Sequence, residues 1–223
     1  MPRSIPLSDA APRAIGPFEQ PFKPGKGGRL HSRFGAFCHV TLAPGFVSCN
    51  LGRQFDPSKR EVTLFAQCED TDIEEHMAAI TDAGREAATR ELGKAPSKFT
   101  ECLTRGEHGT SLKISLTDKT QLFERHDLAD GAPPKRTPIA LDELFEDDSE
   151  WRSKRLVAFV KILLPTVWAK KAGDSAGVKV RAARVTFMLV GGDDDDDSSD
   201  DDDDGADLEA GVIGQAAKRQ RRE

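Results

Sequence analysis

The sequence predicts a mainly β (α+β) fold, an antiparallel barrel or sandwich with one inserted helix, flanked by polar ends. Three observations indicate this fold class. Seven to nine short segments show the alternating or apolar pattern of strands. Only one stretch, at about 72–92, keeps helical spacing. The chain of 223 residues suffices for one domain of about 150–170 residues with tails.

The strand candidates begin at residue 33. Segments 33–42 (RFGAFCHVTL) and 46–51 (FVSCNL) are separated by Ala-Pro-Gly, which predicts a hairpin. Phe159 and Phe187 lie in later candidates and are expected core residues. The remaining candidates are 60–67 (REVTLFAQ), 98–103, 111–116, 121–125, a short apolar stretch at 139–145, 156–164 and 178–190.

The one predicted helix is amphipathic and structural in character. Thr71 or Asp72 can cap its N-terminus, where Glu74 and Glu75 suit the positive end of the helix dipole. We expect it to end at Gly93. Its apolar positions keep helical spacing: Ile73, Met77, Ile80 and Ala87–Ala88.

Two low-complexity ends flank the predicted domain, which we place at 33–192. Residues 1–32 are rich in Pro, Gly and Ala without periodicity, so we expect a disordered arm, within which PFEQPFKPGKGG can lie extended against the domain through Phe18 and Phe22. Residues 193–223 contain ten aspartates around Ser198-Ser199, and this disordered tail cannot form a core. It ends in a basic cluster typical of a nuclear import signal: Lys218, Arg219, Arg221 and Arg222.

The net charge of −6 is divided unevenly along the chain. Residues 151–192 carry nine basic residues and only Asp174, a net charge of +8, whereas residues 193–223 carry −9. A flexible connection keeps opposite charges at high effective concentration. The tail can therefore compete for a polyanion that the basic segment binds. The alternative interpretation is that both segments only solvate the protein.

The sequence indicates a binding protein, not an enzyme, and no cofactor, metal or membrane contact. The motifs GxGxxG, GxxxxGK[ST] and GxSxG are absent. The four cysteines form no CxxC pair and the five histidines are scattered, so we expect free thiols and no metal centre. No apolar run reaches the roughly 18–20 residues of a membrane span.

A surface for a single strand of nucleic acid needs cations for phosphates and exposed aromatic faces for bases. Residues 151–187 offer both, with the only two tryptophans. Trp151 is interpreted as structural. Trp168, followed by lysines and glycines, is either a base-stacking residue at the start of a loop or a core anchor. The candidate contacts are Trp168, Lys154, Arg155, Lys170, Lys171, Lys179 and Arg181, with Phe123 and Arg125 as weaker candidates.

Three segments resemble, in their order, a family from algal large DNA viruses and protists: the strand SLKISL, then QLFER, then LVAFVKILLPTVWAKKAGDSAGVKVRAARVTFMLV. That family is similar to the single-stranded DNA-binding proteins of T7-like bacteriophages. The signature of this family matches Trp168, Gly177-Val178 and the final strand 180–190. The predicted helix, followed by Lys98-Phe99, resembles the inserted helix of the family. Over about residues 33–190 the resemblance implies an OB-fold barrel that binds single-stranded DNA in replication, recombination or repair.

The resemblance also implies that the acidic tail competes with DNA and recruits partners such as replication proteins. This chain departs from the family because it continues into KRQRRE instead of closing on an aromatic residue, which favours a nuclear location. A second function stays open. A β-rich core, an Asp run and an import signal also resemble nucleoplasmin-like chaperones, whose acidic tract binds histones. The oligomeric state is open, a dimer included.

Overall fold

The fold is taken from a computed structural model of the chain, which divides into two units, Met1–Gly192 and Asp193–Glu223. Lys154, the predicted tail and its import signal lie outside the described residues. The described residues all belong to the first unit: 4–7, 22–25, 29–33, 39–52, 60–68, 71–106, 109–126, 133–145, 150–153, 155–163 and 165–190.

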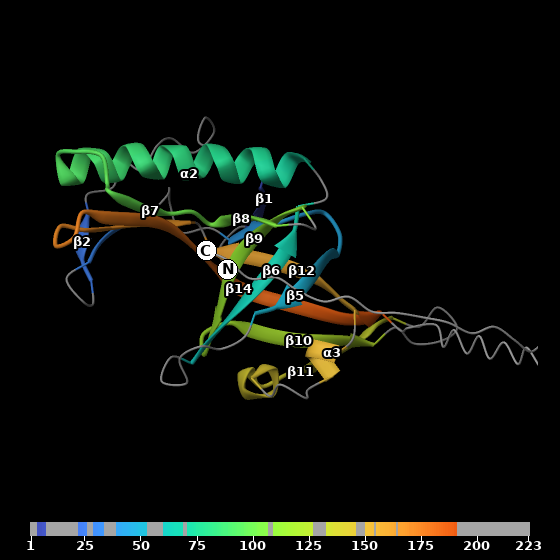
Figure 1. Ribbon diagram of the computed structural model, residues 1–223. Coiled ribbons are helices and arrows are strands. Elements are labelled where there is room, and N and C mark those ends of the chain that lie inside the picture. Colours follow the sequence, from blue (N-terminus) through green and yellow to red (C-terminus); the bar gives the residue numbers. More distant parts are fainter. Residues whose placement is uncertain are drawn as a thin grey trace, which may run out of the picture. The chain divides into compact units, whose positions relative to one another are not determined.

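The described part of the chain is mainly β (Figure 1). Its helices are α2 (Thr71–Leu92), α3 (Glu150–Ser153) and the 3₁₀ helix η4 (Leu141–Leu144). Its strands are β1 (Ser4–Pro6), β2 (Lys23–Pro24), β3 (Leu30–Arg33), β4 (His39–Thr41), β5 (Val47–Leu51), β6 (Glu61–Gln67), β7 (Lys98–Thr100), β8 (Leu103–Gly106), β9 (Gly109–Thr117), β10 (Gln121–His126), β11 (Lys135–Pro138), β12 (Arg155–Leu163), β13 (Thr166–Lys170) and β14 (Ser175–Val190).

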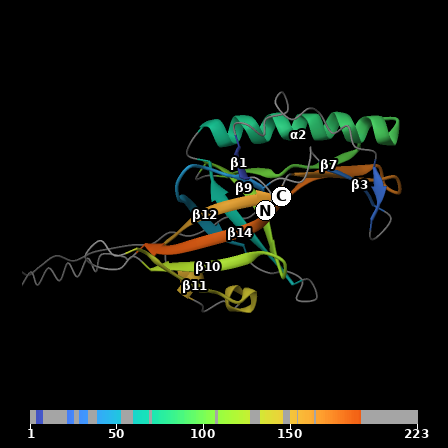
Figure 2. The ribbon, with the colours of Figure 1, turned by 180° about the vertical axis from the view of Figure 1, so that it is seen from behind.

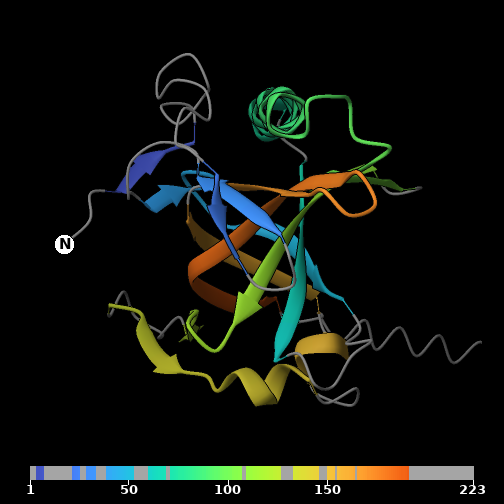
Figure 3. The ribbon, with the colours of Figure 1, turned by 90° about the vertical axis from the view of Figure 1, so that its left-hand side faces the viewer.

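Five of these strands close into a barrel. β5 pairs with β6 and β6 with β9, while β12 pairs with both β5 and β14, all antiparallel. The circle closes through a short parallel pairing of β9 with β14, in which Ile114 lies opposite Val180 and Ser115 opposite Arg181. With α2 inserted between β6 and β9 in the chain, this is the predicted OB-like barrel with an inserted helix (Figure 3).

Strand alternation fills the barrel with apolar side chains. Successive side chains of a strand point to opposite faces, so every second residue of β6, β9 and β12 is buried. Phe187 of β14 is fully buried and lies 5.7 Å from the ring of Trp151, which confirms the structural role predicted for that tryptophan. Phe159 was predicted in the core, but it lies on the outer face of β12 and is half-buried.

Helix α2 covers one side of a small second sheet that β13 and the first part of β14 form with β3 and β7 (Figure 1). Its buried side chains include Ile73, Met77 and Ile80, at the spacing that the sequence predicted. The helix ends at Gly93, whose φ of +73° favours glycine. Within the described residues, no helix has the length and apolar character needed to cross a bilayer.

The predicted hairpin between 33–42 and 46–51 is wrong. Both β4 and β5 pair with β12, one after the other along the same strand: β4 with Lys161–Leu163 and β5 with Leu156–Ala158. Leu42 donates its N–H to the carbonyl of Val160 between these two pairings. The Ala-Pro-Gly segment therefore bends the chain without reversing it, so that β4 and β5 run in the same direction along β12.

Several short strands carry no signal in the sequence. The disordered arm predicted for residues 1–32 contains β1, β2 and part of β3, which pair through their backbones with β4, β3 and β13, and Phe22 packs against the core. β11 lies between the candidates 121–125 and 139–145, in a stretch for which the sequence predicted no strand. The candidate 98–103 is two strands, β7 and β8, which separate at the buried Cys102. Strands of two to four residues are too short to show a periodic pattern.

Candidate nucleic-acid interface

The long strand β14 presents polar and basic residues on one face and apolar residues on the other. Ala176, Val178 and Val180 are buried beneath α2 or inside the barrel. The residues that alternate with them therefore share the opposite face: Ser175, Gly177, Lys179 and Arg181. Lys179 is half-buried and Arg181 is exposed.

Neighbouring strands extend this face by their register. On β13, Lys170 lies opposite Ser175 and Trp168 opposite Gly177. On β7, Lys98 lies opposite Ser175 from the other side. One surface thus brings together four of the predicted contacts with Lys98, which was not among those predicted contacts. We call it the β14 face: Trp168, Lys170, Lys179, Arg181 and Lys98.

Trp168 lies within β13 and not at the start of a loop, since the turn comes only after Lys170. Its ring is half-buried, and the guanidinium of Arg29 stands 4.8 Å from the ring centroid. Gly177 makes this packing feasible, because a Cβ at that position would lie 3.0 Å from Trp168 Cζ2 and 2.6 Å from the carbonyl oxygen of Thr100. Trp168 is therefore neither a buried anchor nor a freely exposed side chain.

The β14 face continues onto the barrel strands β9 and β6. Arg181 lies opposite Ser115, and Lys113 occupies the same face of β9 two residues earlier. Phe65 of β6 lies opposite Lys113 and is half-buried. Sequence reasoning missed both residues, although the alternation of REVTLFAQ and SLKISL already places them opposite the apolar face of each strand.

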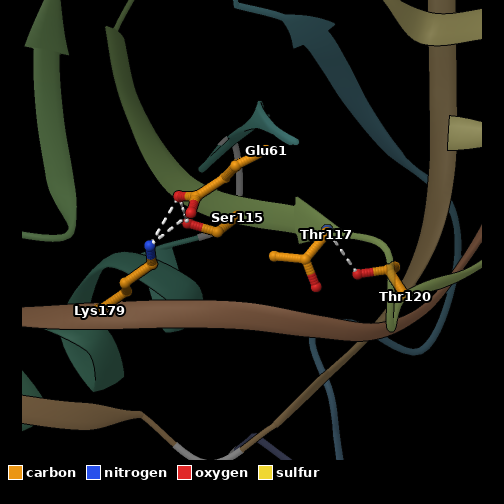
Figure 4. A network of polar contacts seen from close by, with 5 residues as sticks. All are labelled: Glu61, Ser115, Thr117, Thr120 and Lys179. Atoms are coloured by element: carbon orange, nitrogen blue, oxygen red, sulfur yellow. Dashed lines mark hydrogen bonds and ion pairs between the residues drawn. The ribbon is translucent and has the colours of Figure 1, made fainter. Parts of the chain in front are cut away.

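The carboxylate of Glu61 faces this surface and holds Lys179 (Figure 4). Lys179 Nζ donates to Glu61 Oε1 at 2.6 Å and to Oε2 at 2.9 Å, and Ser115 Oγ donates to Oε1 at 2.8 Å. Burial alone would raise the pKa of Glu61. The hydrogen bonds from Lys179 and Ser115, with the positive charges of Lys179 and Arg181, outweigh it and hold this pKa below its ordinary value.

The other cations of the surface differ in their partners. Lys171, in the turn after β13, lies 3.7 Å from Glu91 of α2, and Lys94 pairs with Asp174 at 2.6 Å. Lys98, Lys170 and Arg181 form no ion pair with another described residue. These three are therefore the cations of the β14 face that an anionic ligand can reach without displacing a carboxylate among the described residues.

The remaining predicted contacts lie elsewhere. Arg155 is exposed and opposite Val190, whereas Trp168 is opposite Gly177, thirteen positions earlier on β14. At about 3.3 Å per residue this separation is up to roughly 40 Å along the strand. Phe123 and Arg125 lie on β10, beside the second half of β14. The sequence-predicted set is therefore not one groove.

The described residues contain no group of three or more His, Cys, Asp or Glu side chains arranged to hold a metal ion. The three described cysteines are free: Cys49 and Cys102 are buried, and burial raises the pKa of the Cys49 thiol to about 12. Comparison of the sequence with protein-family models and with curated proteins gives no match.

Proposed function

We propose that this protein binds single-stranded DNA and that the β14 face is its main contact surface. The observation that carries the proposal is the shared register of Trp168, Lys170, Lys179 and Arg181 on one side of the β13–β14 ribbon. Proteins that bind single strands combine a basic groove with aromatic platforms. OB folds use the outer face of their second and third strands, here β6 and β9, together with neighbouring loops.

Each residue type has a distinct task in this proposal. Lys98, Lys170 and Arg181 neutralise phosphates, and the counterions that they release make the affinity salt-dependent. Trp168 stacks on a base through the part of its ring that Arg29 leaves accessible. Lys179 reaches a phosphate only when its bond to Glu61 opens, so Glu61 limits its contribution.

The acidic tail, residues 193–223, competes with DNA for the same basic face. It carries 13 acidic residues, and its connection to the end of β14 gives it a high effective concentration. The tail also recruits replication proteins, and the basic cluster at 218–222 directs the protein to the nucleus. The biological setting that follows is DNA replication, recombination or repair.

The deciding experiment is fluorescence anisotropy of a labelled poly-dT 30-mer with the full chain and with residues 1–192, at low and moderate salt. We expect salt-sensitive binding that tightens when the tail is removed, with a gain that shrinks as salt rises. Equal affinity of both chains at low salt overturns the tail competition. An absence of binding by both chains overturns the proposed function, and histones then become the ligands to test.

A further inference from the structure

Three phenylalanines form a row across the outer face of the barrel, away from Trp168. Phe123 of β10 and Phe159 of β12 both lie opposite Thr186 of β14, one from each side. The ring of Phe46 lies 6.3 Å from that of Phe159. All three rings are half-buried. β12, β14, β10 and β11 lie side by side in this region (Figure 2). We call Phe46, Phe159 and Phe123 the phenylalanine row.

An arginine stands over each end of the phenylalanine row. The guanidinium of Arg184 lies 5.4 Å from the ring centroid of Phe123, and that of Arg125 lies 5.2 Å from the ring of Phe46. Arg184 also donates to Gln121 Oε1 through Nε and Nη2, at 3.1 and 2.8 Å. These contacts keep both cations at the row.

Like charges face each other beside the row. Lys161 lies directly opposite Arg184 on β12 and β14, and Arg125 lies opposite Arg136 on β10 and β11. Like charges at opposite positions destabilise a sheet. The nearest carboxylate on β10, Glu124, lies on the other face of the strand and pairs with His126 at 3.1 Å. Cationic side chains therefore gather on the face of these strands that carries the rings, and such a cluster is complementary to an anion.

We infer that the phenylalanine row is a second base-binding station for the same DNA strand. This inference rests on the proposed function and adds a site to it. A β-sheet face with two or three aromatic side chains is the surface on which RNA-recognition modules stack bases. Here the bases stack on the rings, and Arg125 and Arg184 move from the rings to the adjacent phosphates.

The two proposed base-binding stations, at Trp168 and at the phenylalanine row, lie along the same protein strand, β14. Trp168 lies opposite Gly177, and Phe123 and Phe159 lie opposite Thr186, nine positions further along β14. Nine residues span up to about 30 Å of strand. At the duplex rise of about 3.4 Å per nucleotide in one strand, about nine stacked nucleotides cover that length, within the range of about 4–16 nucleotides for one OB fold.

The test uses the full chain and a labelled dT 16-mer at low salt. Phe123→Leu and Phe159→Leu keep an apolar side chain and remove the ring, so their folding is checked by thermal unfolding and their DNA affinity by anisotropy. We expect each leucine variant to weaken DNA binding about fivefold or more. Phe123→Tyr keeps an aromatic ring and should bind DNA like the wild type. Val157→Ala is the matched control, because Val157 lies half-buried on the same face of β12 outside the row.

The outcomes separate this inference from the proposed function. If the row variants bind like the wild type while Trp168→Phe or Arg181→Ala binds more weakly, the second station is overturned and the proposed function stands. If the wild type itself does not bind, both are overturned. Cross-linking of an iodouracil-substituted 16-mer to a peptide that contains Phe123 or Phe159 supports the station directly. Cross-links confined to β13 and β7 contradict it.

Discussion

Lys179 and Glu61 form an ion pair of 2.6 Å at the seam where the barrel closes. Only two residue pairs join β9 to β14 at this seam, and the ion pair reaches across it to β6. Close by, Thr120 Oγ1 accepts the N–H of Thr117 (Figure 4). The same hydroxyl donates to the carbonyl of Ala182. Side-chain contacts therefore reinforce a backbone pairing that is short, and they do so on the surface proposed to bind DNA.

Glu61→Gln is expected to strengthen DNA binding and to weaken the fold. The neutral amide no longer holds Lys179, which then adds one phosphate contact, while the barrel loses an ion pair worth about 1 kcal/mol of unfolding free energy. Anisotropy at low salt and urea unfolding measure the two effects.

Glu91→Gln is the control for Glu61→Gln, because Glu91 also pairs with a lysine, the exposed Lys171 at 3.7 Å, but lies outside the barrel. We expect it to change stability very little. If Glu61→Gln binds DNA no more tightly than the wild type, Glu61 does not restrain Lys179.

The stability contributed by Glu61 should disappear in acid. Its pKa in the folded protein is lowered from 4.5, so the folded state binds its proton less readily than the unfolded chain. The contribution is therefore fully present above the unfolded value and is lost as the pH falls through the folded value. Urea unfolding of the wild type and Glu61→Gln should differ at about pH 6, and the difference should shrink as the pH falls below 4.5. A difference that persists unchanged in acid contradicts this assignment.

Gly177→Ala is expected to destabilise the protein by about 1–3 kcal/mol. The added Cβ would lie 2.6 Å from the carbonyl oxygen of Thr100 and 2.8 Å from its Cβ, so the backbone of β7 has to move. Thermal or urea unfolding measures the change. Gly45→Ala is the matched control, since a Cβ there meets nothing within 4 Å. Equal stability of the two variants would show that β7 yields easily at this point.

The sequence predicted the fold wherever elements are long and periodic. REVTLFAQ, SLKISL and the helix at 72–92 alternate or repeat because one face is buried, and α2, β6 and β9 follow those limits closely. The β4–β5 turn was wrong because Ala-Pro-Gly permits a bend as well as a hairpin, and the choice depends on β12, more than 100 residues later. Short N-terminal strands were missed because backbone pairing requires no side-chain pattern.

The site was predictable in residue type more than in arrangement. Trp168, Lys170, Lys179 and Arg181 share a face because β13 and β14 form a hairpin, which the sequence did not reveal, since TVWAK is only five residues long. Arg155 belongs to the same basic segment but lies on β12, opposite the far end of β14. Nor does the sequence show that Lys179 is held by Glu61, 118 residues away.

Trp168 should report DNA binding by its fluorescence. A base stacked on an indole quenches its emission, and Trp168 is half-exposed whereas Trp151 is buried against Phe187. Quenching by dT oligonucleotides should therefore vanish in Trp168→Phe and persist in Trp151→Phe. Trp168→Ala should also weaken binding by about 1–3 kcal/mol. Quenching that survives in Trp168→Phe places the base elsewhere.

Removal of single cations from the β14 face should lower the salt dependence of binding by a predictable amount. For a single strand, the logarithm of the binding constant falls against the logarithm of salt concentration with a slope of about −0.7 per neutralised phosphate. Lys170→Ala and Arg181→Ala, whose side chains have no ion pair with a described carboxylate, should each reduce the slope by about 0.7. Lys171→Ala should reduce it less, because Glu91 already holds that lysine. Equal slopes for all three variants would mean that these cations act through the net charge of the protein. A larger loss for Lys171→Ala would instead place the DNA path over the β13–β14 turn and α2.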